Sequence, residues 1–356
     1  MDVATVTNVV NETPDSVCVT LEVPEEQTSR YTYLQGQNVT LIREISGEEV
    51  RRSYSICSSV ADASLRVGIK RVENGRFSTW ATTELAVGDE LGILPPAGSF
   101  NVALRPESAR HHLGIAAGSG ITPILSILKT TLETEPESSF TLIYGNKTTE
   151  TVMFLEELAD LKNEYFDRLT VFHVLSQEKQ NSELLSGRIT SATLEGFFES
   201  LLDPRAIDEV FLCGPYEMVV DLQETLATSG ISPASVHTEL FGTPQTAEPA
   251  KTAASNNTNV TADPSSVQVI LDGTSTTVVI ESADESILDA ALKVRRDLPF
   301  ACKGGVCATC KAKVVEGSVD MNLNYSLSDE EVAEGYVLTC QSHPTSSDVV
   351  IDYDQR

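Results

Sequence analysis

Basic residues are scarce in this chain. Its 356 residues include 25 Lys and Arg against 52 Asp and Glu, a formal net charge of −27. Because affinity for phosphate backbones and anionic lipid surfaces comes mainly from clustered Lys and Arg, this shortage argues against nucleic acid and membranes as partners. A basic partner protein would suit the charge, but solubility or a salty cell explains it more simply.

Long hydrophobic runs are also missing. The most apolar stretch, residues 113–128, is interrupted by Gly118, Gly120 and Pro123 and falls short of a membrane-spanning helix. The first ten residues have neither a basic start nor a long apolar core, so we expect no secretory signal. Cysteine is uncommon too: there are seven, and three of them fall within residues 302–310. An odd number with one dense group is typical of a metal or cluster site in a reducing compartment, so we expect a cytoplasmic protein.

Length and composition predict several folded domains. Hydrophobic residues make up 41% and charged residues 22%, a balance that supplies buried cores. At roughly 100 to 200 residues per domain, the length predicts two or three domains. Over residues 1–104, short strands with period-two alternation are punctuated by turn residues at Asn74-Gly75 and Pro95-Pro96. This pattern predicts an antiparallel β-barrel.

The pattern changes after the barrel. Over residues 105–242, short apolar runs alternate with helical patterns, which predicts a doubly wound α/β domain with a parallel sheet. Residues 243–266 are rich in Thr, Pro, Ala, Asn and Ser and cannot bury a core, so they predict a flexible linker. Residues 267–356 combine strands with a helix and predict a small α+β domain. The expected strands are 113–117, 140–144, 169–175, 210–213, 236–239, 267–271, 277–280, 311–315 and 349–352.

Four cysteines near the end of the chain give the most specific motif. A C-x4-C-x2-C run with a distant fourth cysteine is the plant-type spacing for a [2Fe–2S] cluster. A structural zinc site is the alternative, but common zinc spacings pair two C-x2-C units and only one is present. We expect Gly304 and Gly305 to take positive φ angles and to offer backbone N–H donors to the cluster. The four cysteines are Cys302, Cys307, Cys310 and Cys340.

A glycine-rich turn lies between a predicted strand and a predicted helix. Gly118 and Gly120 form the turn, and we expect Thr122 at the N-cap and Pro123 at the first helical position. Such a strand-turn-helix unit builds an anion site for a pyrophosphate. Many glycine turns that enter helices bind nothing, and the dinucleotide fingerprint would place a glycine where Pro123 stands, so this motif taken alone is weak.

A barrel strand carries residue types that a flavin needs. The strand reads Arg52-Ser53-Tyr54-Ser55, which supplies a cation for a phosphate, an aromatic face for a flat ring and hydroxyl groups. Further along, Gly75, Arg76 and Ser78 lead into a short helix. Out of context these are ordinary surface residues.

Two later strand ends carry further candidates. Cys213-Gly214-Pro215 ends one predicted strand, and Glu239 and Phe241 end the next. Taken singly, a buried structural thiol and an edge-of-core phenylalanine are the ordinary interpretations.

The order of these motifs along the chain is informative. A barrel with Arg-x-Tyr-Ser, an α/β domain with a glycine-rich turn and Cys-Gly-Pro, a linker and a four-cysteine domain resemble the ferredoxin–NADP reductase superfamily fused to a plant-type ferredoxin. The resemblance covers essentially the whole chain. It extends to the reductase subunits of phenylacetyl-CoA epoxidases through four segments, which are residues 118–123, 238–241, 302–310 and 335–344.

The resemblance implies a β-grasp fold for the last domain and the cofactors FAD, [2Fe–2S] and NADPH or NADH. It implies that Ser55, Cys213 and Glu239 surround flavin N5 and the nicotinamide and shape hydride transfer. Tyr54 would stack on the isoalloxazine, and Phe241 takes the place of the ring-stacking aromatic. The FAD residues are Arg52, Ser53, Tyr54, Ser55, Gly75 and Ser78. The NAD(P) residues are Gly118, Gly120, Thr122, Pro123, Gly214 and Pro215, bordered by Met218.

The choice between the two nucleotides depends on cations for the adenosine 2′-phosphate. Lys147 and Lys179 follow the second and third strands of the α/β domain and are placed to provide them. Related NADPH enzymes often have arginine after the serine at Ser176, where this chain has Gln177. We expect NADPH, with NADH as the alternative.

The resulting hypothesis is an electron-transfer reductase. Electrons would pass from NAD(P)H to FAD, then to the [2Fe–2S] cluster and on to an oxygenase, the diiron complex that epoxidises phenylacetyl-CoA being the expected acceptor. Another diiron or Rieske oxygenase is the alternative partner. A self-contained NAD(P)H oxidase and a non-enzymatic, metal-stabilised docking module are alternatives of other kinds.

Overall fold

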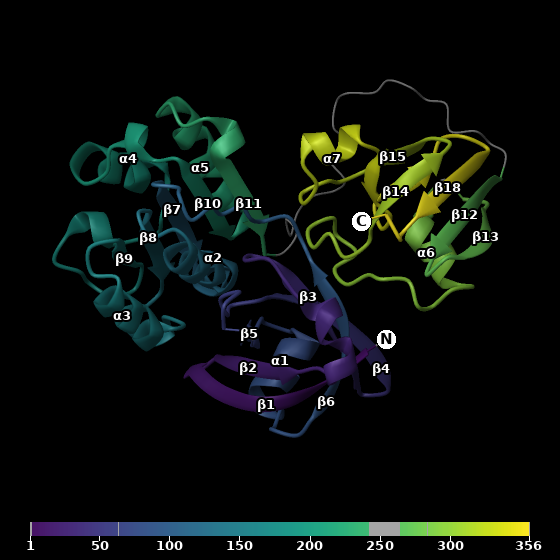
Figure 1. Cartoon of the computed structure of the whole chain (residues 1–356), viewed down its shortest axis with the longest axis horizontal. Helices are drawn as coiled ribbons and strands as arrows, with labels where there is room; N and C mark the ends of the chain where they lie inside the picture. Colours follow the sequence, from purple (N-terminus) through teal and green to yellow (C-terminus); the bar gives the residue numbers. More distant parts are fainter. Residues whose placement is uncertain (1, 63, 242–263, 283, 356) are drawn as a thin grey trace.

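The structure is a computed structural model that describes residues 2–62, 64–241, 264–282 and 284–355. Figure 1 shows three bodies in chain order: an antiparallel barrel, a helix-flanked parallel sheet and a small mixed α+β unit. The predicted fold class is confirmed. Within the described ranges, no helix is both long enough and apolar enough to cross a membrane.

The barrel is built from strands that run in the order β4-β3-β6-β1-β2-β5, each antiparallel to its neighbours. Ile56, just beyond β4, forms an antiparallel bridge with Val67 of β5 and brings the two ends of the sheet together. Val17, Val19 and Leu21 point into the barrel core, as period-two alternation predicts. The elements are β1 (Asp2–Thr13), β2 (Ser16–Glu22), β3 (Asn38–Ile45), β4 (Glu48–Ser55), β5 (Leu65–Lys70), α1 (Arg76–Thr83) and β6 (Glu90–Ala97).

One predicted turn of the barrel is wrong. Pro95 and Pro96 lie inside β6, not between strands. They fall where the register of β6 against β3 shifts, between the pairs Asn38–Ala97 and Thr40–Leu94. Residues in a bulge do not donate the backbone hydrogen bonds that join neighbouring strands, so proline, which has no N–H, is tolerated there.

The second body is a parallel sheet in the order β11-β10-β7-β8-β9, with helices on its faces. The chain first builds β7, β8 and β9 outward and then returns to add β10 and β11 on the other side of β7. The order therefore reverses between β7 and β10, which is where open α/β sheets bind ligands. The elements are β7 (His111–Ala117), α2 (Ile121–Thr134), β8 (Ser139–Asn146), α3 (Leu155–Glu164), β9 (Leu169–Leu175), α4 (Ser191–Ser200), β10 (Glu209–Gly214), α5 (Tyr216–Thr228) and β11 (Val236–Leu240).

The third body is a mixed sheet in the order β13-β12-β18-β14-β16, with a separate β15–β17 ribbon. β12 begins at Ser265, inside the segment that the sequence predicts as linker, and the rest of that prediction, residues 243–263, lies outside the described residues. The elements are β12 (Ser265–Leu271), β13 (Thr274–Ile280), α6 (Ile287–Leu292), β14 (Lys311–Glu316), β15 (Val319–Met321), α7 (Asp329–Ala333), β16 (Tyr336–Leu338), β17 (Ser342–Pro344) and β18 (Asp348–Asp352).

The three bodies meet at one place. The loop that carries the first three predicted cluster cysteines lies between β3 and β4 of the barrel and the end of β11 of the parallel sheet (Figure 1). The chemistry-bearing residues are therefore concentrated where the bodies converge.

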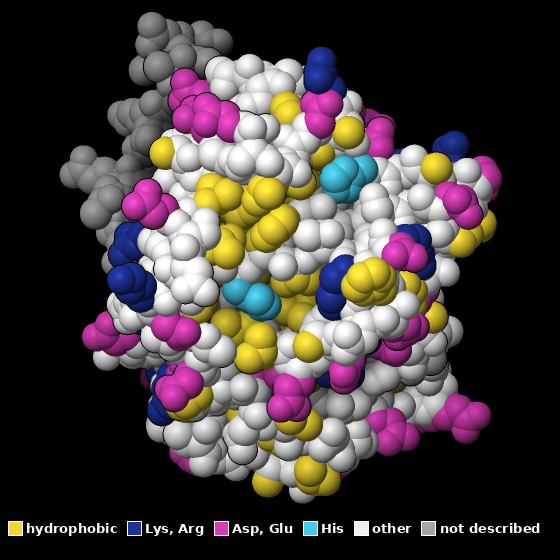
Figure 2. All heavy atoms as spheres, turned by 90° about the vertical axis from the view of Figure 1, so that its left-hand side faces the viewer, with side chains coloured by type: hydrophobic (Ala, Val, Ile, Leu, Met, Phe, Trp, Pro, Cys, Tyr) yellow, Lys and Arg dark blue, Asp and Glu magenta, His cyan; other side chains and the backbone are white. Residues whose placement is uncertain are grey.

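On the outer face of the parallel-sheet body, Asp and Glu side chains lie around the edge and hydrophobic side chains gather near the centre (Figure 2).

Candidate functional site

Ser55 and Glu239 join the barrel to the parallel sheet. Ser55 is the last residue of β4, and its hydroxyl donates a hydrogen bond of 3.1 Å to Oε2 of Glu239 in β11. Burial raises the pKa of Glu239 to about 8, the Ser55 hydrogen bond opposes this rise, and the nearby Cys307 adds to it. A carboxyl group with such a pKa can hold or release a proton near neutral pH.

Cys213 lies beside Glu239. It belongs to β10, where it pairs in register with Glu239 of β11 on one side and Ala116 of β7 on the other. Its side chain is fully buried, and burial raises the pKa of the thiol well above its usual range. The structure thus brings the three residues predicted to shape hydride transfer together at the carboxyl ends of β10 and β11, next to the reversal of strand order between β7 and β10.

The predicted flavin strand, β4, has two different faces. Tyr54 packs on Phe77 of α1 at 5.5 Å between ring centroids, and burial raises the pKa of its hydroxyl. Arg52 is exposed and donates to the carbonyl of Arg51 at 2.7 Å. Ser53 lies on the opposite face from both, because side chains alternate along a strand. The structure therefore separates Ser53 from Arg52 and Tyr54, whereas Ser55, two positions further along the strand, shares the face of Ser53.

Gly75 and Ser78 form one compact turn at the start of α1. The Ser78 hydroxyl accepts a hydrogen bond of 3.1 Å from the backbone N–H of Val72 and keeps its own proton to donate. A Cβ at Gly75 would lie 2.4 Å from that hydroxyl oxygen, so glycine is needed for this approach. The turn stands at a helix start, as a phosphate site would require.

The glycine-rich turn also depends on close contact. A Cβ on Gly120 would lie 2.2 Å from the carbonyl oxygen of Cys213, so only glycine allows β7, β10 and α2 to approach here. Gly118 has a φ of +55°, and its carbonyl accepts a hydrogen bond of 2.9 Å from the Tyr144 hydroxyl. These contacts explain on structural grounds why glycine stands at both positions, in addition to the ligand-binding role that the sequence predicts.

The predicted start of the following helix is wrong. Gly120, not Thr122, is the N-cap of α2, and Thr122 and Pro123 lie within its first turn. The reason is that residues 118–120 form a 3-10 turn that runs directly into the helix. Proline is still tolerated because the first N–H groups of a helix have no partner inside it. The Thr122 hydroxyl donates to the carbonyl of Ser119 at 3.0 Å.

Gly214, Pro215 and Phe241 border the same strand ends. Pro215 is the N-cap of α5, and a Cβ on Gly214 would lie 2.6 Å from the Met218 methyl carbon. The backbone N–H of Phe241 donates to the Gly214 carbonyl at 3.4 Å, and its half-buried ring packs against the core under α2.

Lys147 and Lys179 are both exposed, beyond the ends of β8 and β9. A carboxylate that sequence reasoning missed is close to this region. Glu178 accepts hydrogen bonds from the backbone N–H of Thr149 at 2.7 Å and from its hydroxyl at 2.9 Å, which links the two loops. The only feature of the sequence that points to Glu178 is its position next to Lys179. Its pairing with Thr149 depends on how the two loops fold, which the sequence pattern does not show.

The four predicted cluster cysteines are free thiols that meet in two pairs. Cys302 hydrogen-bonds to Cys307, and Cys310 to Cys340. The bond from Cys302 lowers the pKa of Cys307 to about 5, and the bond from Cys310 lowers the pKa of Cys340. Among the described residues, no three His, Cys, Asp or Glu side chains converge on a single-ion site.

Backbone and amide N–H groups point at these sulfur atoms. The Gly304 N–H lies 3.3 Å from Cys302 Sγ, and Gln341 Nε2 lies 3.7 Å from Cys340 Sγ. The expectation of positive φ angles at both glycines is wrong in part. Gly305 has a φ of +76°, but Lys303 and Ala308 take the other left-handed positions of the loop.

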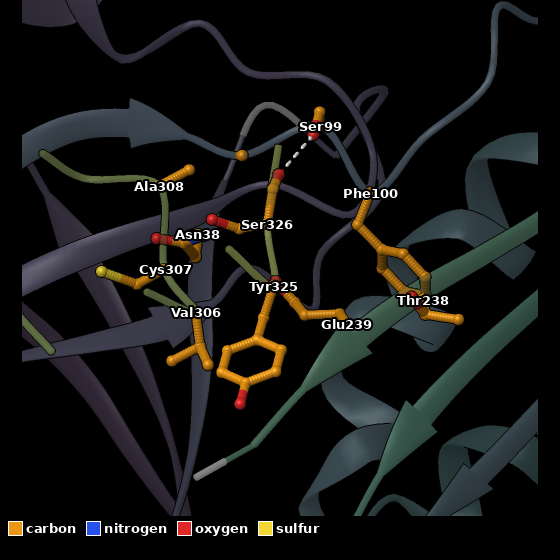
Figure 3. Close-up of a pocket in the computed structure, with 11 residues that line it drawn as sticks. Asn38, Ser99, Phe100, Thr238, Glu239, Val306, Cys307, Ala308, Tyr325 and Ser326 are labelled. Carbon is orange, nitrogen blue, oxygen red and sulfur yellow. Dashed lines mark hydrogen bonds between the residues drawn. The ribbon is translucent and has the colours of Figure 1, made fainter. Parts of the chain in front are cut away.

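A small pocket lies where the three bodies meet (Figure 3). Figure 3 shows Glu239, Val306, Cys307 and Tyr325 around it. Tyr325 also packs edge-on against Tyr216 at the start of α5, with ring centroids 6.0 Å apart. The pocket therefore adjoins both the predicted hydride-transfer residues and the cysteine loop.

Comparison with known proteins agrees with this arrangement. The chain matches an oxidoreductase FAD-binding domain over residues 3–102, an oxidoreductase NAD-binding domain over residues 115–224 and a 2Fe-2S iron-sulfur cluster binding domain over residues 269–345. It is 46% identical over 352 residues to one subunit of the 1,2-phenylacetyl-CoA epoxidase of Escherichia coli (strain K12), covering 99% of this chain and 97% of the relative.

Two further proteins broaden the comparison. The ferredoxin reductase component of 3-ketosteroid-9-alpha-monooxygenase from Rhodococcus rhodochrous is 34% identical over 358 residues, covering 99% of this chain and 96% of the relative. Phthalate dioxygenase reductase has the same fold, with a TM-score of 0.59 at 23% identity, covering 98% of this chain and 97% of that one. This chain belongs to the ferredoxin–NADP reductase superfamily with a C-terminal ferredoxin domain. It is an electron-transfer reductase with FAD-binding, NAD-binding and [2Fe–2S] domains.

The cysteine loop of the reductase fits a [2Fe–2S] cluster. Each iron of such a cluster takes two thiolates, and the structure supplies two pairs of thiols. N–H groups donate to the sulfur atoms of Cys302 and Cys340, and each such bond acts to lower the pKa of its thiol, although the bond to Cys307 outweighs this effect at Cys302. The donor set and its hydrogen bonds therefore match the group that the spacing predicts.

The sequence reasoning missed the residues of the reductase that join its bodies. Arg51, Tyr216 and Tyr325 make contacts between bodies, and Thr309 bonds to Ser53 of the barrel. Thr309 stands inside the cysteine motif and could have been singled out. The others are ordinary exposed residue types until the fold brings their partners close.

Proposed function

We propose that this reductase delivers electrons to the oxygenase component of a phenylacetyl-CoA epoxidase, in aerobic phenylacetate catabolism in the cytoplasm. The 46% identity to the epoxidase subunit of Escherichia coli, over nearly the whole of both chains, carries this proposal. NAD(P)H supplies a hydride, and bound FAD and [2Fe–2S] divide its two electrons into single-electron steps toward the oxygenase.

The proposed domains follow the predicted boundaries except that β12 already begins at Ser265: residues 1–104 bind FAD, 105–242 bind NAD(P)H, 243–264 link, and 265–356 hold the cluster. The resemblance and the geometry together support the site roles. Tyr54 would stack on one face of the isoalloxazine, and Arg52 would bind the pyrophosphate of FAD. Glu239, with a pKa of about 8, can hold a proton beside the reacting ring edge through its bond to Ser55.

The remaining proposed residues bind the nucleotide and the cluster. The nucleotide pyrophosphate would lie at the N-terminus of α2, against Gly118 and Gly120, because backbone N–H groups there favour anions. Gly214, Pro215 and Phe241 would border the nicotinamide. The cluster ligands are Cys302, Cys307, Cys310 and Cys340.

We infer NADPH as the preferred nucleotide, with NADH as the alternative. The two exposed lysines, Lys147 and Lys179, support a 2′-phosphate. Glu178 and Gln177 oppose it, because a carboxylate repels a phosphate and glutamine carries no charge.

A reductase for another oxygenase is the second candidate. The 34% identity to the 3-ketosteroid-9-alpha-monooxygenase component favours it, and so does the 33% identity to a glycine betaine monooxygenase reductase subunit of Pseudomonas aeruginosa. The family match favours either enzyme over the docking module.

Reconstitution separates these candidates. Purified reductase is first titrated anaerobically with NADPH and then NADH, and bleaching of overlapping flavin and iron–sulfur bands is expected. It is next mixed with purified phenylacetyl-CoA epoxidase oxygenase components, and NADPH oxidation should require phenylacetyl-CoA. Turnover only with a Rieske oxygenase component would overturn the epoxidase assignment, and oxygen consumption at full rate without any acceptor would indicate an oxidase.

A further inference from the structure

Arg51 is a charged residue that lies mostly buried between two bodies. It belongs to β4, and only 10% of its side chain is exposed. Its guanidinium group lies over the ring of Phe300 at 4.3 Å and donates to the carbonyl oxygens of Leu298 at 3.3 Å and Arg296 at 3.5 Å. Glu49 of the same strand holds it with an ion pair of 2.7 Å.

These partners lie immediately before the cysteine loop. Residues 296–300 run into Cys302 without an intervening helix or strand. A guanidinium group presents several N–H donors in a rigid plane and stacks on aromatic rings, so it can hold two carbonyls and a ring at once. Lys303 lies over the same Phe300 ring at 5.0 Å, which extends the contact to the residue after Cys302.

The same face of the barrel holds the other end of the loop. Ser53 lies two positions after Arg51 on β4, so both side chains point the same way. The hydroxyls of Ser53 and Thr40 each lie 3.3 Å from the hydroxyl of Thr309, the neighbour of Cys310. The outer face of β3 and β4 therefore contacts the cysteine loop on both sides of Cys307.

We propose that Arg51 is a positioning residue that seats the cysteine loop against β4 and so sets the distance between the flavin and cluster sites. This proposal rests on the proposed function. Arg52 and Tyr54, on the opposite face of the same strand, are proposed flavin residues, and Ser55 follows on the face of Arg51 and Ser53. One short strand thus carries both proposed flavin residues and the contacts that hold the cluster loop.

Arg43 provides a matched control. It lies on the adjacent strand β3, with its guanidinium group over the Trp80 ring at 5.0 Å and a hydrogen bond of 2.9 Å to the Glu90 carbonyl. These are the same kinds of contact as those of Arg51, but both partners lie within the barrel. Arg51→Ala, Arg51→Lys and Arg43→Ala therefore separate a general loss of an arginine from loss of the loop contact.

The first measurement is amide hydrogen exchange of the full chain over residues 296–300. Loss of a stacked arginine and its carbonyl bonds should speed exchange there by about tenfold in Arg51→Ala. The exchange rate in Arg51→Lys should lie between those of Arg51→Ala and the parent, because an ammonium group keeps the charge but not the planar set of N–H donors of a guanidinium group. Arg43→Ala should leave this segment unchanged, and unaltered exchange in Arg51→Ala would overturn the proposal.

The second measurement uses two electron acceptors with the loaded enzyme. Arg51→Ala should lower cluster-dependent reduction of cytochrome c several-fold while flavin-dependent reduction of ferricyanide, flavin content and iron content stay at the parent level. Equal loss of both activities would assign Arg51 to general stability and overturn the proposal. If the parent protein itself reduces neither acceptor with NADPH or NADH, the proposed function fails, and the exchange measurement still decides whether Arg51 seats the loop.

Discussion

At the scale of single residues, hydrogen bonds set the pKa values of the cluster cysteines. Cys307 is buried and receives a hydrogen bond from the Cys302 thiol, which lowers the pKa of Cys307 to about 5, whereas the pKa of Cys302 is raised. Cys18 and Cys57 form another close thiol pair, with sulfur atoms 3.9 Å apart, but they lie within protein cores away from the loop. Cys18 also accepts a hydrogen bond of 3.5 Å from the Arg66 guanidinium group. Neither pairing nor an N–H donor therefore defines a cluster ligand, and the four-cysteine spacing does.

We predict that Cys307→Ser removes the cluster but keeps the flavin. Serine is a poor ligand for iron–sulfur clusters, which are held by thiolates, so iron content and cytochrome c reduction should fall to near background. Reduction of ferricyanide, which takes electrons directly from flavin, should remain. Iron analysis and the two steady-state assays check this.

Cys18→Ser is the matched control for Cys307→Ser. It replaces a buried thiol that has no part in the loop, so iron content and both activities should stay near the parent values. A parallel loss of ferricyanide and cytochrome c reduction in Cys307→Ser would contradict the proposed order of electron flow.

At the scale of strands and helices, the sequence predicts elements well where the signal is local. Period-two alternation located β2 and β5, and apolar runs located β7 to β11, because burial on one or both faces leaves a pattern within a few residues. The turn expected at Pro95-Pro96 is wrong because the bulge that accommodates these prolines inside β6 depends on the partner strand β3.

The candidate site shows the same limit. The cysteine spacing and the Ser55, Cys213 and Glu239 set could be named from motifs, and the structure brings the last three together. Arg51 could not be named, because nothing within its own strand indicates that residues 296–300 lie against it. Contacts between bodies leave no periodic signal in the sequence.

Glu135 connects several elements of the parallel-sheet body. Its fully buried carboxylate, just after α2, accepts hydrogen bonds from the Arg110 side chain, the Arg105 backbone N–H and the Ser138 hydroxyl. Burial raises its pKa, but these hydrogen bonds outweigh burial and hold the pKa at about 2. Because the folded value lies below the unfolded one, the ionised group contributes stability above the unfolded pKa, and that contribution is lost as pH falls toward 2.

We predict that Glu135→Gln lowers the free energy of unfolding by roughly 3 kcal/mol near neutral pH, which corresponds to a pKa of about 2 in the folded protein against 4.5 in the unfolded chain. The difference from the parent should shrink steadily as pH falls from about 4.5 toward 2, because in this range the carboxylate takes up a proton in the unfolded chain but not yet in the folded one. Urea titrations at several pH values measure it. Glu137→Gln, at an exposed position in the same turn, is the control and should change stability little at any pH. A difference that stays constant with pH would contradict the assignment.

At the scale of the whole molecule, the net charge of −27 opposes compaction. Acidic side chains lie around the edge of the face in Figure 2, so much of this repulsion acts through solvent, where salt screens it with a Debye length of about 8 Å at 0.15 M. Salt also weakens exposed ion pairs such as Arg205–Asp203, but each such pair contributes only about 0 to 1 kcal/mol. The unpaired acidic excess should therefore decide whether added salt stabilises or destabilises the folded protein.

We predict that the midpoint of thermal unfolding rises by several degrees when NaCl increases from about 10 mM to about 500 mM, as repulsion among the unpaired carboxylates is screened. Calorimetry of the full-length protein at neutral pH measures this. KCl at equal ionic strength is the control, because screening depends on ionic strength and not on which monovalent cation is present. A midpoint that falls with salt would show that attractive ion pairs, and not the acidic excess, dominate the electrostatics of the folded reductase, and that the acidic surface costs it little stability.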